Sequence, residues 1–133
     1  MAFENHNTYV LTGAIANNSN VSILNGISPR FERHYFNIRF YNSEGAAINQ
    51  DSANRVSNNS MAGSVTFEVS DNGDQFGTIT VGTNTNGVLN LGDDDYERPN
   101  ALGTIKLARI DMSNITSAGA ATHFRLEVNS YSN

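Results

Sequence analysis

The clearest pattern in this chain is the alternation of apolar and polar residues near its C-terminus. In the stretch "GAATHFRLEVNSY", the apolar residues Phe124, Leu126 and Val128 fall on one side of an extended chain. The polar residues between them fall on the other side, because side chains alternate between the two faces of a strand. The pattern therefore predicts a strand over residues 122–131 whose apolar face closes a core.

Seven further segments have the composition and spacing of strands, with turn-forming residues between them. They cover residues 8–16, 21–24, 31–42, 65–69, 76–81, 87–91 and 102–112. The sequence "DNGD" between two of them contains Asn72-Gly73, which is a strong hairpin signal. Short strands at this spacing predict an all-β fold, namely a single antiparallel β-sandwich or jelly roll of about eight strands.

Two segments do not follow the strand pattern. Residues 43–63 have no clean period, so we expect a long loop, with a weak helix over residues 46–56 as an alternative. Residues 1–7 are polar apart from Met1 and Phe3, and we expect a flexible N-terminal arm with these two residues as apolar anchors. Residues 8–133 are then one sandwich domain, as the length of 133 residues favours.

Composition and charge narrow the classes of function. The chain has no cysteine, which excludes disulfides, thiolate metal sites and cysteine nucleophiles. Its net charge of -5 argues against a nucleic-acid partner, which requires a clustered basic surface. No apolar run is long enough to span a membrane, and the N-terminus does not have the pattern of a signal peptide, so we expect synthesis in the cytosol.

The remaining candidate residues are best interpreted as residues that contact other proteins. Seven of the eight basic residues are arginines, which favour planar, two-pronged pairing at protein interfaces. The polar row of the C-terminal strand is expected to pair across strands or with a neighbouring subunit. The candidate contact residues are Met1, Phe3, Asp93, Asp94, Asp95, Arg98, Arg125 and Glu127.

Signals for catalysis, metals and cofactors are weak. Asp71-Asn72-Gly73-Asp74 begins like a calcium loop, but the closing acidic residue is missing. His6, His34 and His123 share no metal-binding spacing, and the chain has no GxSxG, GxGxxG or P-loop motif. We therefore expect no catalytic, metal or cofactor-binding residues, and a protein that is not an enzyme.

Two stretches of the second half resemble small virion proteins of tailed bacteriophages. "GSVTFEVSDNGDQF" is similar to the strand, D-G-type turn and strand of those proteins, and "LARIDMSNITSAGAATHFRLEV" is similar to their C-terminal end. The link "NITSAGAATH" carries extra small residues compared with the family pattern. The resemblance covers residues 63–128, about half of the chain.

The resemblance implies a small sandwich or jelly-roll component of a virion. The expected role is a capsid decoration (cement) protein that binds the outer surface of the major capsid protein lattice as a homodimer or homotrimer, without nucleic acid or membrane contact. The expected location is the virion, after synthesis in the host bacterial cytoplasm. One alternative is a tail, baseplate or fibre-associated module. Another is a carbohydrate-binding sandwich that uses Tyr35, Tyr41 and Tyr96, although the chain has no tryptophan.

Overall fold

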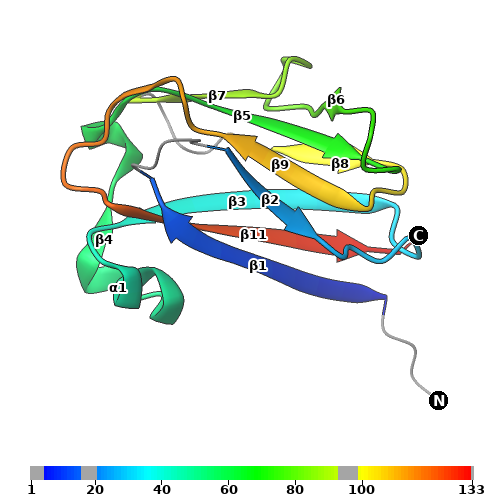
Figure 1. Ribbon diagram of the computed structural model, residues 1–133, viewed down its shortest axis with the longest axis horizontal. Helices are drawn as coiled ribbons and strands as arrows, with labels where there is room; N and C mark the ends of the chain where they lie inside the picture. Colours follow the sequence, from blue (N-terminus) through cyan, green and yellow to red (C-terminus); the bar gives the residue numbers. More distant parts are fainter. Residues whose placement is uncertain (1–4, 16–20, 93–98, 133) are drawn as a thin grey trace.

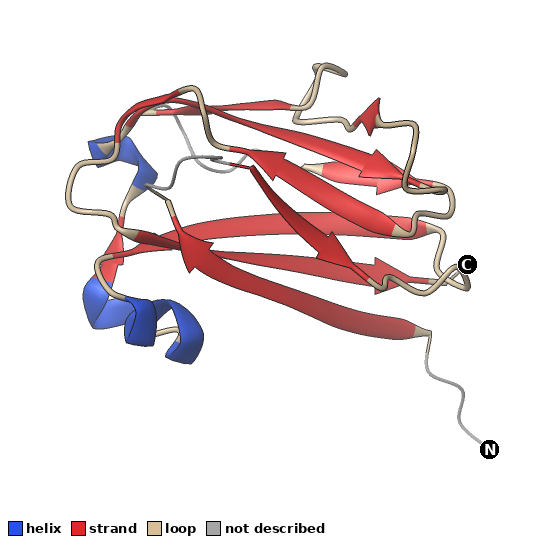
Figure 2. Cartoon of the chain, viewed as in Figure 1, coloured by secondary structure: helices blue, strands red, loops and turns tan. Residues whose placement is uncertain are grey.

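Two antiparallel β-sheets packed face to face make up the fold (Figures 1 and 2). The structure is a computed structural model that describes residues 5–15, 21–92 and 99–132. The predicted all-β sandwich is confirmed, while the finer assignment of a jelly roll stays a prediction. Within the described ranges the chain forms eleven strands, compared with the eight expected, because several strands are only two or three residues long.

The first sheet is built around the C-terminal strand. Its strand order is β1 (His6–Ala14), β11 (His123–Tyr131), β3 (Arg33–Tyr41) and β4 (Arg55–Val56), and β8 (Asn100–Leu102) also pairs with β3. β11 lies between β1 and β3 and pairs with each of them over nine residues in an unbroken register. The first and last strands of the domain therefore lie side by side.

The second sheet is built around the middle of the chain. Its strand order is β10 (Ile115–Ser117), β5 (Ala62–Ser70), β9 (Leu107–Asp111) and β2 (Val21–Asn25). The short strands β6 (Gly77–Thr78) and β7 (Val88–Leu91) pair with β5. β2 closes one side of this sheet, and it approaches β1 of the first sheet at the same side of the sandwich (Figure 1).

The core lies between the sheets, where the predicted apolar face of β11 is fully buried. Phe124, Leu126 and Val128 have no exposed surface, and Phe67 of β5 faces them from the other sheet. The predicted core face of Phe124, Leu126 and Val128 is thus confirmed. Leu107 is also buried, but it lies outside this cluster because Ala108 and Ile110 are the residues of β9 that point inward.

The segment expected as a long loop, residues 43–63, is a series of short capped elements. α1 (Glu44–Asn49) begins after Ser43, whose side chain accepts a hydrogen bond from the backbone N–H of Ala46. Two short 3-10 turns, η1 (Ser52–Asn54) and η2 (Asn58–Ser60), follow the same rule, with Asp51 and Ser57 as their caps. The weak helix considered over residues 46–56 is therefore shorter and begins two residues earlier, where the cap fixes its start.

The turn around Asn72-Gly73 is wider than a two-residue hairpin. β5 and β6 pair through Glu68 with Thr78, so the connection extends across the whole "DNGD" sequence. Ser70 accepts a hydrogen bond from the N–H of Gly73, and the side chain of Asn72 accepts from the next two backbone N–H groups. Bonds of this kind are the reason why Asn and Ser favour turns, and the return strand β6 that follows has only two residues.

Candidate functional site

The outer face of the first sheet carries the predicted contact residues Arg125 and Glu127. Both lie on β11, pointing away from the core, in the middle of the sheet. Their side chains are only 11% and 21% exposed. Neighbouring side chains therefore cover these two residues and restrict their conformations.

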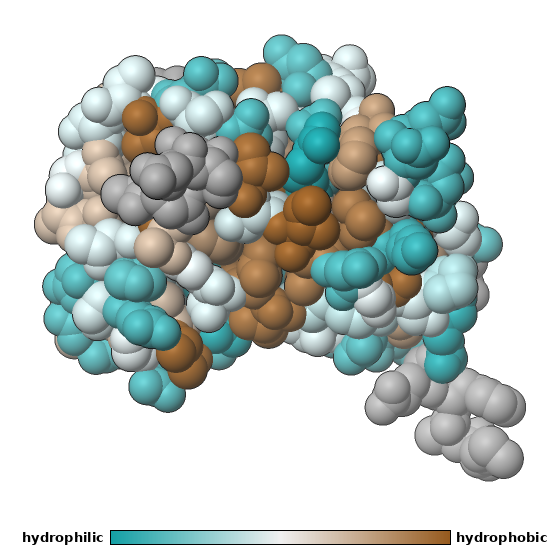
Figure 3. Space-filling model, viewed as in Figure 1, coloured by the Kyte–Doolittle hydropathy of each residue, from teal (hydrophilic) through white to brown (hydrophobic). Residues whose placement is uncertain are grey.

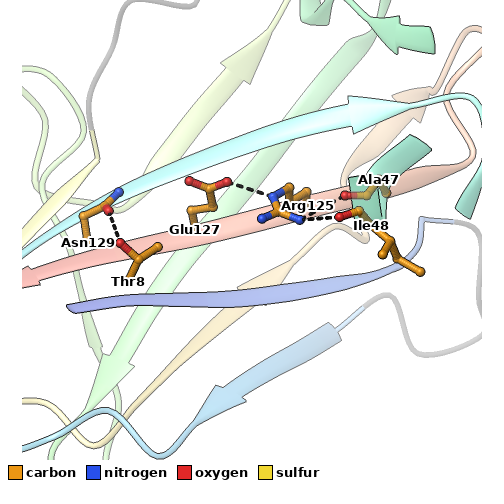
Figure 4. Close-up of polar contacts among 6 residues, drawn as sticks. All are labelled: Thr8, Ala47, Ile48, Arg125, Glu127 and Asn129. Atoms are coloured by element: carbon orange, nitrogen blue, oxygen red, sulfur yellow. Dashed lines mark hydrogen bonds and ion pairs between the residues drawn. The ribbon is translucent and has the colours of Figure 1, made fainter. Parts of the chain in front are cut away.

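Arg125 and Glu127 pair with each other along one strand. The Arg125 Nε donates to Glu127 Oε2 at 2.8 Å (Figure 4). The expectation of a pair across strands is not met, because the residues beside Arg125 on the neighbouring strands are Thr12 and Arg39. A contact with a neighbouring subunit stays a prediction.

Arg125 also attaches α1 to the sheet. Its Nη1 donates to the backbone carbonyl oxygens of Ala47 at 3.2 Å and Ile48 at 3.1 Å (Figure 4). These carbonyls lie in the last turn of α1, where helical carbonyls have no partner inside the helix. The buried ring of Tyr41 packs against Ala46 and Ala47 of the same helix. Arg125 therefore links α1 to the first sheet.

An aromatic cluster occupies the other end of this outer face. The rings of His6 and Tyr131 are stacked with centroids 4.5 Å apart, and Tyr35 meets Tyr131 edge-on at 5.8 Å. The guanidinium of Arg33 lies 5.7 Å from the Tyr131 ring centroid. Tyr35 is 41% exposed and so presents one aromatic surface to solvent.

The carbohydrate alternative loses part of its expected platform in this arrangement. Tyr41, which was a candidate, is buried beneath α1 and cannot offer its ring to a sugar. Tyr96 lies outside the described residues. Only Tyr35 of the three candidate tyrosines is shown to be exposed.

The outer face of the second sheet carries a second fixed arginine. Arg109 makes two parallel hydrogen bonds to the carboxylate of Glu68, at 3.2 Å and 3.0 Å. Its guanidinium also lies 3.7 Å from the ring centroid of Phe76. The planar guanidinium of Arg109 can bind the carboxylate and stack on the aromatic ring at the same time. Arg109 is therefore fixed by contacts inside the domain.

His34 and Ser130 form a buried polar pair that the sequence analysis missed. His34 Nδ1 lies 2.7 Å from Ser130 Oγ, and His34 Nε2 lies 3.0 Å from the Gly103 carbonyl oxygen. Because a carbonyl only accepts, Nε2 carries the proton, and Nδ1 accepts from the serine hydroxyl. Burial lowers the pKa of His34, against the opposing effect of hydrogen bonds to the backbone of Gly103 and Phe31.

This pair has the atoms of a serine–histidine couple but no access for a substrate. Both side chains have no exposed surface. Strand parity was the signal that could have found them, because His34 continues the inward face of Phe36, and Ser130 that of Val128. The pair is accordingly a structural one, and it occupies two inward-facing positions at the end of the core.

The remaining predicted contact residues cannot be placed. Met1, Phe3, Asp93, Asp94, Asp95 and Arg98 lie outside the described residues. Within the part of the chain that the structure describes, no group of three or more metal-binding side chains comes together. In that same part, no helix has the length and apolar character needed to cross a membrane.

Comparisons with known proteins identify similar structures but no family. No protein family and no curated protein matches the sequence. The SPBc2 prophage-derived protein YomS is a similar structure, with a TM-score of 0.49 and 10% identity over 98% of this chain and 99% of that one. A chain of Bacillus endospore appendages, described as disulfide-linked pili, has a TM-score of 0.41 and 8% identity over 96% of this chain and 88% of that one. At this level of likeness the function has to be argued from the chain itself.

Proposed function

We propose that this protein is a non-enzymatic structural component of a tailed-bacteriophage virion, and that it decorates the outer surface of the capsid. The observation that carries the proposal is that the polar side chains of the candidate site make contacts within the domain. Arg125, Glu127, Arg109 and Glu68 are engaged in contacts that stabilise the sandwich, and His34 is enclosed in it. Side chains held in this way suit a protein that binds other proteins better than one that catalyses a reaction.

The exposed large apolar side chains support a role in protein contact. They are spread over both sheets and the helix, and comprise Val10, Val21, Ile23, Tyr35, Ile48 and Leu102. Scattered apolar side chains are normal on a protein surface, whereas neighbouring ones mark contact sites, so Val21 and Ile23, which lie on the same side of β2, are the candidates for protein contact. Many modest contacts of this kind add up when a protein binds a lattice in many copies.

The region that resembles small virion proteins supports the same reading. Residues 63–128 include the central strands of both sheets, β5 and most of β11. The family pattern therefore coincides with the framework of the domain and not with a peripheral hairpin. The acidic net charge of -5 favours the outer capsid surface, since packaged DNA would repel such a chain on the inner one.

A binding experiment with capsids tests the proposal. Purified protein is mixed with assembled capsids that lack it, and bound protein is measured after sedimentation, with free capsid subunits as the matched control. We expect saturable binding to the assembled lattice and an increase in capsid heat resistance, because a ligand of the assembled state stabilises that state. Absence of binding to capsids, together with binding to purified tails, would favour the tail or baseplate alternative.

A further inference from the structure

The outer edge of β1 is an unpaired strand edge within the described part of the chain. Asn5 O accepts from Ser132 N, and Ile15 N donates to Thr122 O, so odd-numbered residues of this strand bond to β11. Bonding direction alternates along an antiparallel strand. The even-numbered residues His6, Thr8, Val10 and Thr12 therefore direct their backbone N–H and C=O groups away from the sheet.

This edge does not have the features that usually prevent strand edges from pairing. β1, "HNTYVLTGA", contains no Asp, Glu, Lys, Arg or Pro, although 16% of the chain is charged. Its register with β11 shows no bulge over nine residues. Natural edge strands are commonly protected by charges, proline, bulges or a covering element. Here α1 approaches β1, but Arg125 fixes that helix beside Thr12, near one end of the strand.

We propose that two copies of this chain form a dimer by antiparallel pairing of their β1 strands about a two-fold axis at Val10. Two-fold symmetry pairs residue 10 with itself and residue 8 with residue 12 of the second copy. All of these are even-numbered, so the outward backbone groups of both copies meet. The N–H of Thr8, which donates to Asn7 Oδ1 at 3.0 Å in the single chain, exchanges that partner for the second copy. The two first sheets then become one continuous sheet across the dimer.

A second copy fits this edge better than a foreign strand because the edge is self-complementary. Val10 is 43% exposed and would pack on Val10 of the other copy, while Thr8 would face Thr12. Apolar pairs and threonine pairs are favourable across antiparallel strands. The chain has a net charge of -5, yet this edge is uncharged, so pairing brings no like charges directly together.

The surroundings of β1 also suit a buried contact. Figure 3 shows apolar residues gathered on the side of the molecule where β1 and β2 lie. Val21 and Ile23 of β2 are among the exposed apolar residues. β2 likewise contains no charged residue and no proline. The inference rests on the edge itself and does not depend on where the protein functions.

Cysteine cross-linking tests the register, since the natural chain has no cysteine. A residue pair that exchanges both hydrogen bonds has Cα atoms about 5.5 Å apart, within the range that a disulfide spans. A Val10→Cys variant should therefore form a covalent dimer on mild oxidation. Thr12→Cys alone should not, whereas a mixture of Thr8→Cys and Thr12→Cys variants should. Equal cross-linking of all single variants would overturn the proposed register.

Charge exchange at the axis tests the same contact without a covalent bond. Sedimentation velocity should show wild-type protein at twice its monomer mass of 14.4 kDa. Val10→Lys and Val10→Glu should each be monomeric, and their equimolar mixture should dimerise again, because like charges oppose each other only in the self-pairs. Val10→Thr, a neutral replacement, and Leu102→Lys, at an exposed position on β8, are the controls that should leave the dimer intact.

Folding is checked for every variant by circular dichroism and thermal melting, so that loss of the dimer is not confused with loss of the domain. A wild-type protein that stays monomeric at every concentration would overturn the proposal, and it would indicate that the edge is left for a strand of another protein. A dimer that Val10→Lys leaves intact would overturn it as well.

Discussion

At the scale of single residues, the buried His34–Ser130 pair connects protonation to the stability of the fold. The neutral ring satisfies both of its nitrogen atoms, one as donor to Gly103 and one as acceptor from Ser130. A second proton would place a charge in the core and change the role of Nδ1 from acceptor to donor. This is the physical reason why burial lowers the pKa of this side chain.

The pH dependence of unfolding should report this residue. Because the pKa of His34 in the folded protein lies below its ordinary value of 6.5, the unfolded chain binds a proton first as the pH falls. The stability that the neutral ring provides is full above pH 6.5 and is lost as the pH falls below it. Chemical unfolding at a series of pH values from 8 to 5, about the range of histidine titration, should show this loss. His34→Gln should flatten the profile, and an unchanged slope would contradict the assignment.

The buried Leu126 should contribute much more to the stability of the fold than an exposed leucine. Leu126 has no exposed surface, whereas Leu102 is 78% exposed. Leu126→Ala should lower the free energy of unfolding by about 2–5 kcal/mol through lost burial and an unfilled cavity. Leu102→Ala is the matched control and should change it by less than about 0.5 kcal/mol. Similar melting temperatures for the two variants would contradict the core described above.

At the scale of elements, α1 depends on one side chain of the sheet below it. The helix has only six residues, too short to be stable by itself. Arg125 contacts both Glu127 and the carbonyls of Ala47 and Ile48, and a lysine cannot reproduce this planar set of donors. Arg125→Lys should therefore accelerate hydrogen exchange in residues 44–50. Arg109→Lys, on the opposite sheet, should not do so, and equal effects would contradict the link.

The junction of β5 and β10 depends on a glycine. Gly63 has φ +101, and a Cβ there would lie 2.1 Å from the backbone oxygen of Asn114. Gly63→Ala should cost about 2 kcal/mol or more, because the backbone of both strands must shift. Gly45→Ala in α1, where a Cβ meets nothing, should instead stabilise by roughly 0.5–1 kcal/mol. Thermal melting of the two variants compares them directly, and a Gly63→Ala protein as stable as wild type would be the contrary result.

The elements also show what the sequence could predict. The long strands β3 and β11 agree with their predicted ranges to within two residues, because nine alternating residues define a strand locally. β4, β6 and β8 have two or three residues and form only where a partner strand lies beside them. The order of strands in each sheet has the same non-local origin. Arg125 and Glu127 lie two residues apart on β11. Whether they pair with each other depends on the residues that β1 and β3 place beside them, and the sequence of β11 alone does not contain that information.

At the scale of the whole molecule, the sandwich combines ion-paired arginines on its outer faces with exposed apolar positions and two uncharged edge strands. Glu127 holds Arg125 and Glu68 holds Arg109, and two of the edge strands, β1 and β2, contain no charged residue. These features are the ones on which the proposed assembly role rests. Removal of residues 1–4, which precede the described chain, should leave melting unchanged and lower incorporation into particles. Normal incorporation would contradict a contact role for Met1 and Phe3.

The number and position of copies in purified phage particles test the central claim most directly. Quantitative mass spectrometry of particles, combined with a cryo-electron microscopy map, measures both. The account predicts a copy number that follows the capsid lattice, with density for this sandwich on the outer capsid surface. Absence of the protein from purified particles would contradict a virion role, and density confined to the tail would contradict capsid decoration.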